Sequence, residues 1–179
     1  MKSRAAIGNH PLHPALVPLP IGCFFLAFVA DVLHASTKNV FWYDVAYFAL
    51  AVGILTALCA AVLGFIDFFG VKMSMAGWRL AKWHMGLNLT AVVLYALGWL
   101  IRRDHAAVGT DRWPVAFGLE VVPFLMLGVS GWLGGHMVFV HGVAVQAPGT
   151  APTPERRKVQ MPVRVERRRA YPGQPIGQH

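Results

Sequence analysis

Charge is scarce in this chain of 179 residues: only 13% of them are Asp, Glu, Lys or Arg, and only eight are acidic. Soluble globular domains carry roughly 25% charged residues, and 56% of this chain is hydrophobic. The low charge excludes an ordinary soluble domain and favours a protein that spans a lipid bilayer. The net charge of +8 does not indicate nucleic-acid binding, because the basic residues gather in one tail and at the ends of apolar segments.

Cysteine is nearly absent as well. The two cysteines, Cys23 and Cys59, lie inside apolar segments, where a thiol most simply fills space. The sequence contains no Cys-x-x-Cys and no Cys-x-x-Cys-His, which excludes covalent c-type haem and the usual zinc and iron–sulfur signatures. No Ser, Thr or Cys stands next to a candidate base, so the sequence argues against a hydrolase and leans against an enzyme.

Long apolar runs, in contrast, are abundant. Four segments have the roughly 20 apolar residues that a transmembrane helix needs, and they cover about residues 15–34, 42–69, 80–101 and 115–140. The first segment is too long for the core of a signal peptide and lacks a small-residue cleavage site, so we expect it to be retained. We therefore predict an all-α integral membrane four-helix bundle over residues 1–145.

The sequence also predicts an orientation in the membrane. Residues 146–179 are rich in Pro, Arg, Gln and Gly without apolar periodicity, which predicts a disordered basic tail that contacts anionic lipid or a partner. With four spans, both termini and the connection at 70–79 lie on one side. Twelve of the sixteen Lys and Arg residues fall on that side. The positive-inside rule then places both termini in the cytoplasm.

Polar side chains gather on that same side once the spans are laid out antiparallel. They come from five separate parts of the chain: His10, His13, Asp67, His84, Asn88, His136 and His141. His34, His105 and Glu120 fall toward the opposite face. Ionisable groups at membrane depth are costly unless they have partners, so these residues are candidates for function.

The motif His10-Pro11-Leu12-His13-Pro14 leads directly into the first span. A proline disfavours helical geometry in the residue before it, so we expect both histidines to be extended and to share no helix face. The motif is either an interfacial cap for the first span or a ligand for a metal or haem. His84 and Asn88 are four residues apart and share one face of the third span.

The first half of the chain aligns weakly with the second when His13 is placed on His84. Over residues 13–72 this alignment gives eight identities. Besides that pair, the identities include His34 with His105, Trp42 with Trp113, and Gly64 with Gly135. A duplication of this kind predicts two helix hairpins related by an axis along the membrane normal, with His13 and His84 facing each other.

Three stretches resemble a bacterial membrane-protein family catalogued as domain of unknown function 2231. They are residues 10–22 (HPLHPALVPLPIG), 83–88 (WHMGLN) and 134–143 (GGHMVFVHGV). The resemblance covers about residues 8–145 and implies a four-helix protein of the bacterial inner membrane. Its pattern positions correspond to His10, His13, Asp67, His84, Asn88 and His141, whereas His136 stands at a variable position. Some relatives are fused to Rieske-type iron–sulfur domains, which suggests a redox complex as partner.

Several functional hypotheses follow. The first is a b-type haem protein for electron transfer, with a cofactor site made from His13, His84, His141 and Asn88. The second is a non-catalytic structural or accessory subunit whose His, Asp and Asn network packs the helices. The third is a metal site, with candidate ligands His10, His13, Asp67, His84 and His141. A proton relay or transport role is a further alternative.

Overall fold

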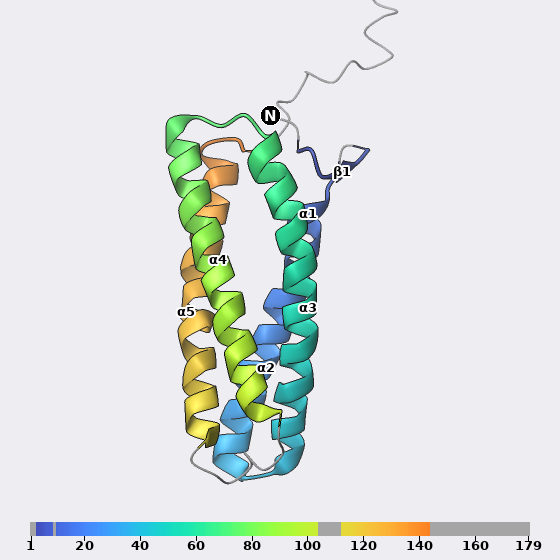
Figure 1. The fold of residues 1–179 in the computed structure, drawn as a ribbon, viewed down its shortest axis with the longest axis vertical. Coiled ribbons are helices and arrows are strands. Elements are labelled where there is room, and N and C mark those ends of the chain that lie inside the picture. Colours follow the sequence, from blue (N-terminus) through green and yellow to red (C-terminus); the bar gives the residue numbers. More distant parts are fainter. Residues whose placement is uncertain (1–2, 9, 104–111, 144–179) are drawn as a thin grey trace, which may run out of the picture. The chain divides into compact units, whose positions relative to one another are not determined.

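The computed structural model describes residues 3–8, 10–103 and 112–143, and its main feature is a bundle of long helices (Figure 1). The elements are β1 (Ala6–Ile7), β2 (His10–Pro11), α1 (Leu12–Leu16), α2 (Pro18–Thr37), α3 (Val40–Gly70), α4 (Met75–Arg102) and α5 (Arg112–Phe139). Within the described residues, four helical segments are long and apolar enough to cross a membrane, the first being α1 and α2 together. The predicted four-helix membrane bundle is confirmed. The predicted tail lies outside the described residues.

The helices form two hairpins, α2–α3 and α4–α5, whose ends are set by local sequence. Lys38 adopts the left-handed conformation that closes α2. Asn39 then caps α3 by accepting a hydrogen bond from the Phe41 amide at 3.0 Å. Ser74 caps α4 in the same way, accepting from the Gly77 amide at 3.1 Å. These side chains satisfy amides that have no partner in the first helical turn, so each turn is short and well defined.

The prediction for the His-Pro motif is right for one histidine and wrong for the other. His10 is extended in β2, whereas His13 lies inside α1. Pro14 stands in the first turn of α1, where the missing N–H would have no helical partner in any case. The helix therefore begins before Pro14, and the Val17 amide donates to the His13 carbonyl at 3.1 Å, which links α1 to α2.

The bundle is packed with small residues inside and large apolar residues outside. Its buried positions include Ala27, Ala30, Ala46, Gly53 and Ala91. The exposed large side chains include Phe48, Leu55, Val62, Leu125 and Trp132. Lipid chains are as apolar as a leucine side chain, so membrane helices gain little by burying apolar groups against each other. They gain most from the close approach that small residues allow. This distribution is the one expected of helices that face lipid.

The bundle has two ends, and the His13 end is the one at which α1 and α4 begin and α3 and α5 finish. The Arg102 end is the opposite one, where α2 and α4 finish and α3 and α5 begin (Figure 1).

The two hairpins meet through residues that the repeat aligns with each other. Phe24 and Tyr95 stack with ring centroids 3.8 Å apart and planes 3° from parallel. Farther along the same helices, Asp31 accepts two hydrogen bonds from Arg102, at 2.8 Å from Nη1 and 2.7 Å from Nη2. Equivalent residues touch each other only near a twofold axis. Because α2 and α4 run in the same direction, this approximate axis is parallel to the helices, as the duplication predicted.

Contacts between the hairpins also occur in reciprocal pairs. Ring contacts join Tyr47 to Trp99 at 5.3 Å between centroids, and Phe117 to Phe28 at 6.0 Å. Polar contacts join the Tyr43 hydroxyl to the Arg102 carbonyl at 2.9 Å, and Trp113 Nε1 to Asp31 Oδ1 at 3.4 Å. The two contacts of each pair become equivalent when α2 is superposed on α4 with Asp31 on Arg102, and α3 is superposed on α5 with Tyr43 on Trp113.

The alignment that places His13 on His84 applies one offset to the whole repeat. That offset is correct for α2 and α4 but wrong by one residue for α3 and α5. Trp113 takes the place of Tyr43 rather than Trp42, and Gly134 rather than Gly135 takes the place of Gly64. Sequence identity favoured the wrong register because tryptophan and glycine happen to stand at the neighbouring positions. The contacts decide the register because they depend on helix faces, which change by about 100° with each residue.

Replacing Arg102 by Ala should lower the free energy of unfolding by about 3–5 kcal/mol, because Asp31 would remain buried without its partner. Arg103→Ala is the matched control: this neighbouring side chain is exposed, and we expect a change within about 0.5 kcal/mol. Unfolding of the purified protein in detergent, followed by circular dichroism, measures both. Equal stability of the two variants would mean that the ion pair does not hold the hairpins together.

Candidate functional site

His13 and His84 occupy equivalent places in the two hairpins and make equivalent bonds. His13 Nδ1 lies 2.8 Å from the Ala60 carbonyl oxygen on α3. His84 Nδ1 lies 2.9 Å from the Ser130 carbonyl oxygen on α5. A carbonyl oxygen can only accept, so in both rings Nδ1 carries the proton and donates it. The lone pair of each neutral imidazole is then on Nε2, which has no hydrogen-bond partner among the described residues.

A glycine faces each imidazole. A Cβ atom built on Gly64 would lie 3.0 Å from Cε1 of His13, and one built on Gly134 would lie 3.1 Å from Cε1 of His84. Each glycine stands four residues after the carbonyl that accepts the histidine's hydrogen bond, one turn farther along the same helix face. The missing side chains therefore let the rings lie flat against the neighbouring helix.

The His84 site has additional polar support. The Asn88 Nδ2 group donates to Ser130 Oγ at 2.6 Å and to the His84 carbonyl oxygen at 2.7 Å. Ser130 Oγ itself lies 3.0 Å from His84 Nδ1. Asn88 and His84 share one face of α4, as their spacing predicted. Asn88 thus acts on His84 through Ser130 and is a positioning residue.

The contacts between the hairpins are concentrated in the half of the bundle nearer the Arg102 end. The Tyr47–Trp99 and Asp31–Arg102 pairs lie there, and the Phe24–Tyr95 pair lies near the middle. Toward the His13 end, α3 and α4 diverge (Figure 1), and Phe68 and Trp78 meet beside the connecting turn at 4.7 Å between centroids. His13 and His84 belong to different hairpins at this end.

Asp67 has a different role from the one that a metal site would require. Its carboxylate accepts hydrogen bonds from the Ser3 hydroxyl, at 2.8 Å to each oxygen. It also accepts from the amides of Arg4 at 2.8 Å and Ala5 at 3.0 Å. The N-terminal segment is not helical there, so its amides are free to donate. Asp67 therefore fastens this segment to the end of α3.

The other predicted ligands are not joined to these groups. His10 is exposed in β2. His141 follows α5 and packs edge-on against His136, with ring centroids 5.3 Å apart. The described residues contain no group of three or more His, Cys, Asp or Glu side chains that could hold a metal ion. Within the described residues, the predicted metal set of His10, His13, Asp67, His84 and His141 is not gathered into one group: helix carbonyls engage His13 and His84, amides engage Asp67, a second imidazole packs against His141, and His10 is exposed.

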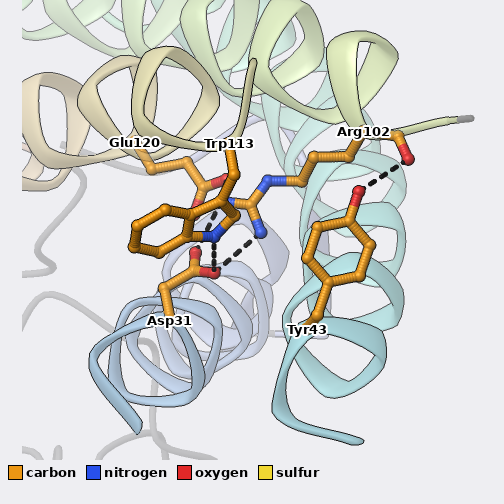
Figure 2. A network of polar contacts seen from close by, with 5 residues as sticks. All are labelled: Asp31, Tyr43, Arg102, Trp113 and Glu120. Carbon is orange, nitrogen blue, oxygen red and sulfur yellow. Dashed lines mark hydrogen bonds and ion pairs between the residues drawn. The ribbon is translucent and has the colours of Figure 1, made fainter. Parts of the chain in front are cut away.

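A second polar cluster, at the Arg102 end, was missed as a candidate site. The Arg102 cluster consists of Asp31, Arg102 and Glu120, which are 0%, 1% and 1% exposed (Figure 2). Arg102 Nη2 lies 2.7 Å from Asp31 Oδ2 and 2.6 Å from Glu120 Oε1. The guanidinium also lies 5.6 Å from the centre of the Tyr43 ring, and Trp113 covers Asp31 on the other side.

The sequence contained a signal for this cluster. Asp31 is the one acidic residue in the first apolar segment, and Arg102 stands at the position that the repeat aligns with it. Arg102 stands at a helix end, where a positive charge is expected from membrane topology alone, so its pairing with Asp31 was not predicted. The position of Glu120 toward this face was predicted, but its partners were not.

Comparison with known proteins places the chain in a family. A model of predicted membrane proteins, DUF2231, matches residues 9–147, well over half of the chain. No curated protein matches the chain, and no solved structure does. The match includes all three motifs, both hairpins and both polar clusters described above. The chain therefore belongs to the DUF2231 family of predicted membrane proteins.

Proposed function

We propose that this integral membrane protein binds a b-type haem between His13 and His84 and uses it to transfer electrons. The observation that supports the proposal most is that both imidazoles give Nδ1–H to a helix carbonyl and leave Nε2 to bind a ligand. Metal-binding histidines usually make this same second bond, which fixes the ring and increases its basicity. His13 and His84, on different hairpins at one end of the bundle, are the two residues that would hold the cofactor.

The number of donors favours haem over a bare metal ion. Zinc sites in proteins have three or four protein ligands, and the described residues bring no third His, Cys, Asp or Glu to this place. A porphyrin supplies four nitrogen donors itself, so two histidines complete the coordination of its iron. When bound, haem would supply reversible one-electron chemistry. His13 and His84 would hold and orient it, and Asn88 would fix His84 through Ser130. His141 is the less favoured ligand because its ring packs against His136.

Charge around the His13 end agrees with this proposal. Lys72, Arg79 and Lys82 are exposed at this end and can pair with haem propionates. The excess of basic residues on the same side supports a cytoplasmic location of both termini in a bacterial inner membrane. We further propose that the basic tail contacts anionic lipid and that a redox complex is the partner.

A second candidate function is that of a structural or accessory subunit without a cofactor. The hydrogen bonds of His84 and Asn88 to Ser130 join α4 to α5, and those of Asp67 fasten the N-terminal segment. Each such bond in a membrane contributes on average about 0.6 kcal/mol. This network would pack the helices whether or not haem binds.

A reduced-minus-oxidised absorption spectrum of the protein, expressed with sufficient haem and purified in mild detergent, tests the proposal. We expect Soret and α-band features of a bis-histidine haem, and their loss in His13→Ala and in His84→Ala. His10→Ala is the matched control, because this exposed imidazole should leave the spectrum unchanged. A wild-type protein without these bands would contradict the haem proposal and favour the structural role.

Gly134→Ala should disturb His84 without removing it. The new methyl group would lie 3.1 Å from the imidazole, so the ring must move, and we expect a loss of about 1–3 kcal/mol in unfolding free energy together with weaker haem binding. Gly131→Ala, on the same helix with open space around it, is the control and should be neutral or slightly stabilising. Thermal unfolding and haem titration measure the two effects. Identical behaviour of both variants would show that the imidazole does not need the space beside Gly134.

A further inference from the structure

The Arg102 cluster buries more negative than positive groups. Two carboxyl groups, Asp31 and Glu120, face one guanidinium, that of Arg102, and all three side chains are at most 1% exposed (Figure 2). If every group were ionised, the cluster would hold one uncompensated negative charge within the bundle. An uncompensated charge in such surroundings is costly, so the group tends to be neutralised.

Hydrogen-bond geometry identifies which carboxyl group is in excess. Asp31 is fully engaged, since it accepts from both Arg102 Nη atoms at 2.8 and 2.7 Å and faces Trp113 Nε1 at 3.4 Å. Glu120 lies 2.6 Å from Arg102 Nη2 but outside hydrogen-bond geometry. Both of its buried oxygens are without a hydrogen-bond donor among the described residues. Glu120 is therefore the less fully compensated of the two carboxyl groups.

The two carboxyl groups converge on the same guanidinium nitrogen. Asp31 Oδ2 lies 2.7 Å and Glu120 Oε1 lies 2.6 Å from Arg102 Nη2. Two ionised carboxylates that converge in this way repel each other, and neither has a proton to donate. With one proton present, one carboxyl group can donate to the other, and Arg102 balances the remaining negative charge. Carboxyl pairs at such short range commonly share a proton for this reason.

From this geometry we infer that the Arg102 cluster is a proton-binding site, in which Glu120 binds the proton, Asp31 accepts its hydrogen bond and Arg102 balances the charge. The inference does not depend on haem binding at the other end of the bundle. A metal cation fits this place poorly, because the guanidinium repels it and Asp31 has its oxygens turned to Arg102. Hard cations also need about six oxygen ligands.

The site lies toward the Arg102 end of the bundle. Glu120 is eight residues after the start of α5, or about 12 Å along the helix axis. His34 lies between the cluster and the helix ends, with its ring edge-on to Tyr43 and Trp113. The titratable and charged groups that the surrounding helices carry toward this end are Asp31 and His34 on α2, Tyr43 and Asp44 on α3, Tyr95 and Arg102 on α4, and Arg112 on α5.

Infrared difference spectroscopy of the full-length protein in lipid nanodiscs tests the inference. At neutral pH we expect the carbonyl-stretch band of a protonated carboxyl group, which shifts in D₂O and disappears at high pH. Glu120→Gln should remove the band, because the amide keeps the shape but cannot titrate. Asp31→Asn should remove it as well, since Glu120 would then be the sole carboxylate facing Arg102 and would ionise.

The controls are Asp67→Asn, at the opposite end, and Asp44→Asn, near the cluster, both of which should keep the band. A wild-type spectrum without a protonated carboxyl group at neutral pH overturns the inference, even if Glu120→Gln does not fold. Persistence of the band in Glu120→Gln overturns it too. A band that appears only when sodium is removed would identify a cation site instead and would equally contradict proton binding.

Discussion

The buried ion pair between Asp31 and Arg102 is the interaction on which the arrangement of the two hairpins depends. Helices in lipid gain little from burying apolar side chains against each other, because lipid is just as apolar. Two hairpins must therefore be joined by close packing and by polar groups that would be costly to leave unpaired. The bidentate geometry of Asp31 and Arg102 fixes both the distance and the register of α2 and α4. The stacked Phe24 and Tyr95 rings then fit one level deeper.

The approximate twofold symmetry explains why the same arrangement of side chains occurs in both hairpins. In each hairpin a histidine on the first helix donates to a carbonyl of the second helix, and a glycine one turn later gives it room. At the axis, however, symmetry must be broken. Two aspartates or two arginines facing each other would repel, so the equivalent positions carry one acid and one base. Glu120 breaks the symmetry further, since Leu50 stands at the corresponding position of α3.

One face of α4 connects the two polar regions. His84, Asn88, Tyr95 and Arg102 recur along it at spacings of four and seven residues, with Ala91 and Gly98 between them, so they lie on one stripe. Their partners differ: Ser130 at the His13 end, Phe24 in the middle, and Asp31 with Glu120 at the Arg102 end. One face of α4 thus carries His84, the proposed haem ligand, and Arg102, the residue that balances the charge in the proposed proton-binding site.

Much of the fold could be predicted because its causes are local. Apolar length determined the four spans, and the spacing of His84 and Asn88 determined their shared face. The tertiary structure alone decided which polar groups meet. His13, Asp67, His84 and His141 stand at one end as predicted, yet they do not form one cluster. Free amides engage Asp67, and helix carbonyls engage both His13 and His84. The pairing of Asp31 with Arg102 likewise required the helix register, because a shift of one residue turns a side chain by about 100° and away from its partner.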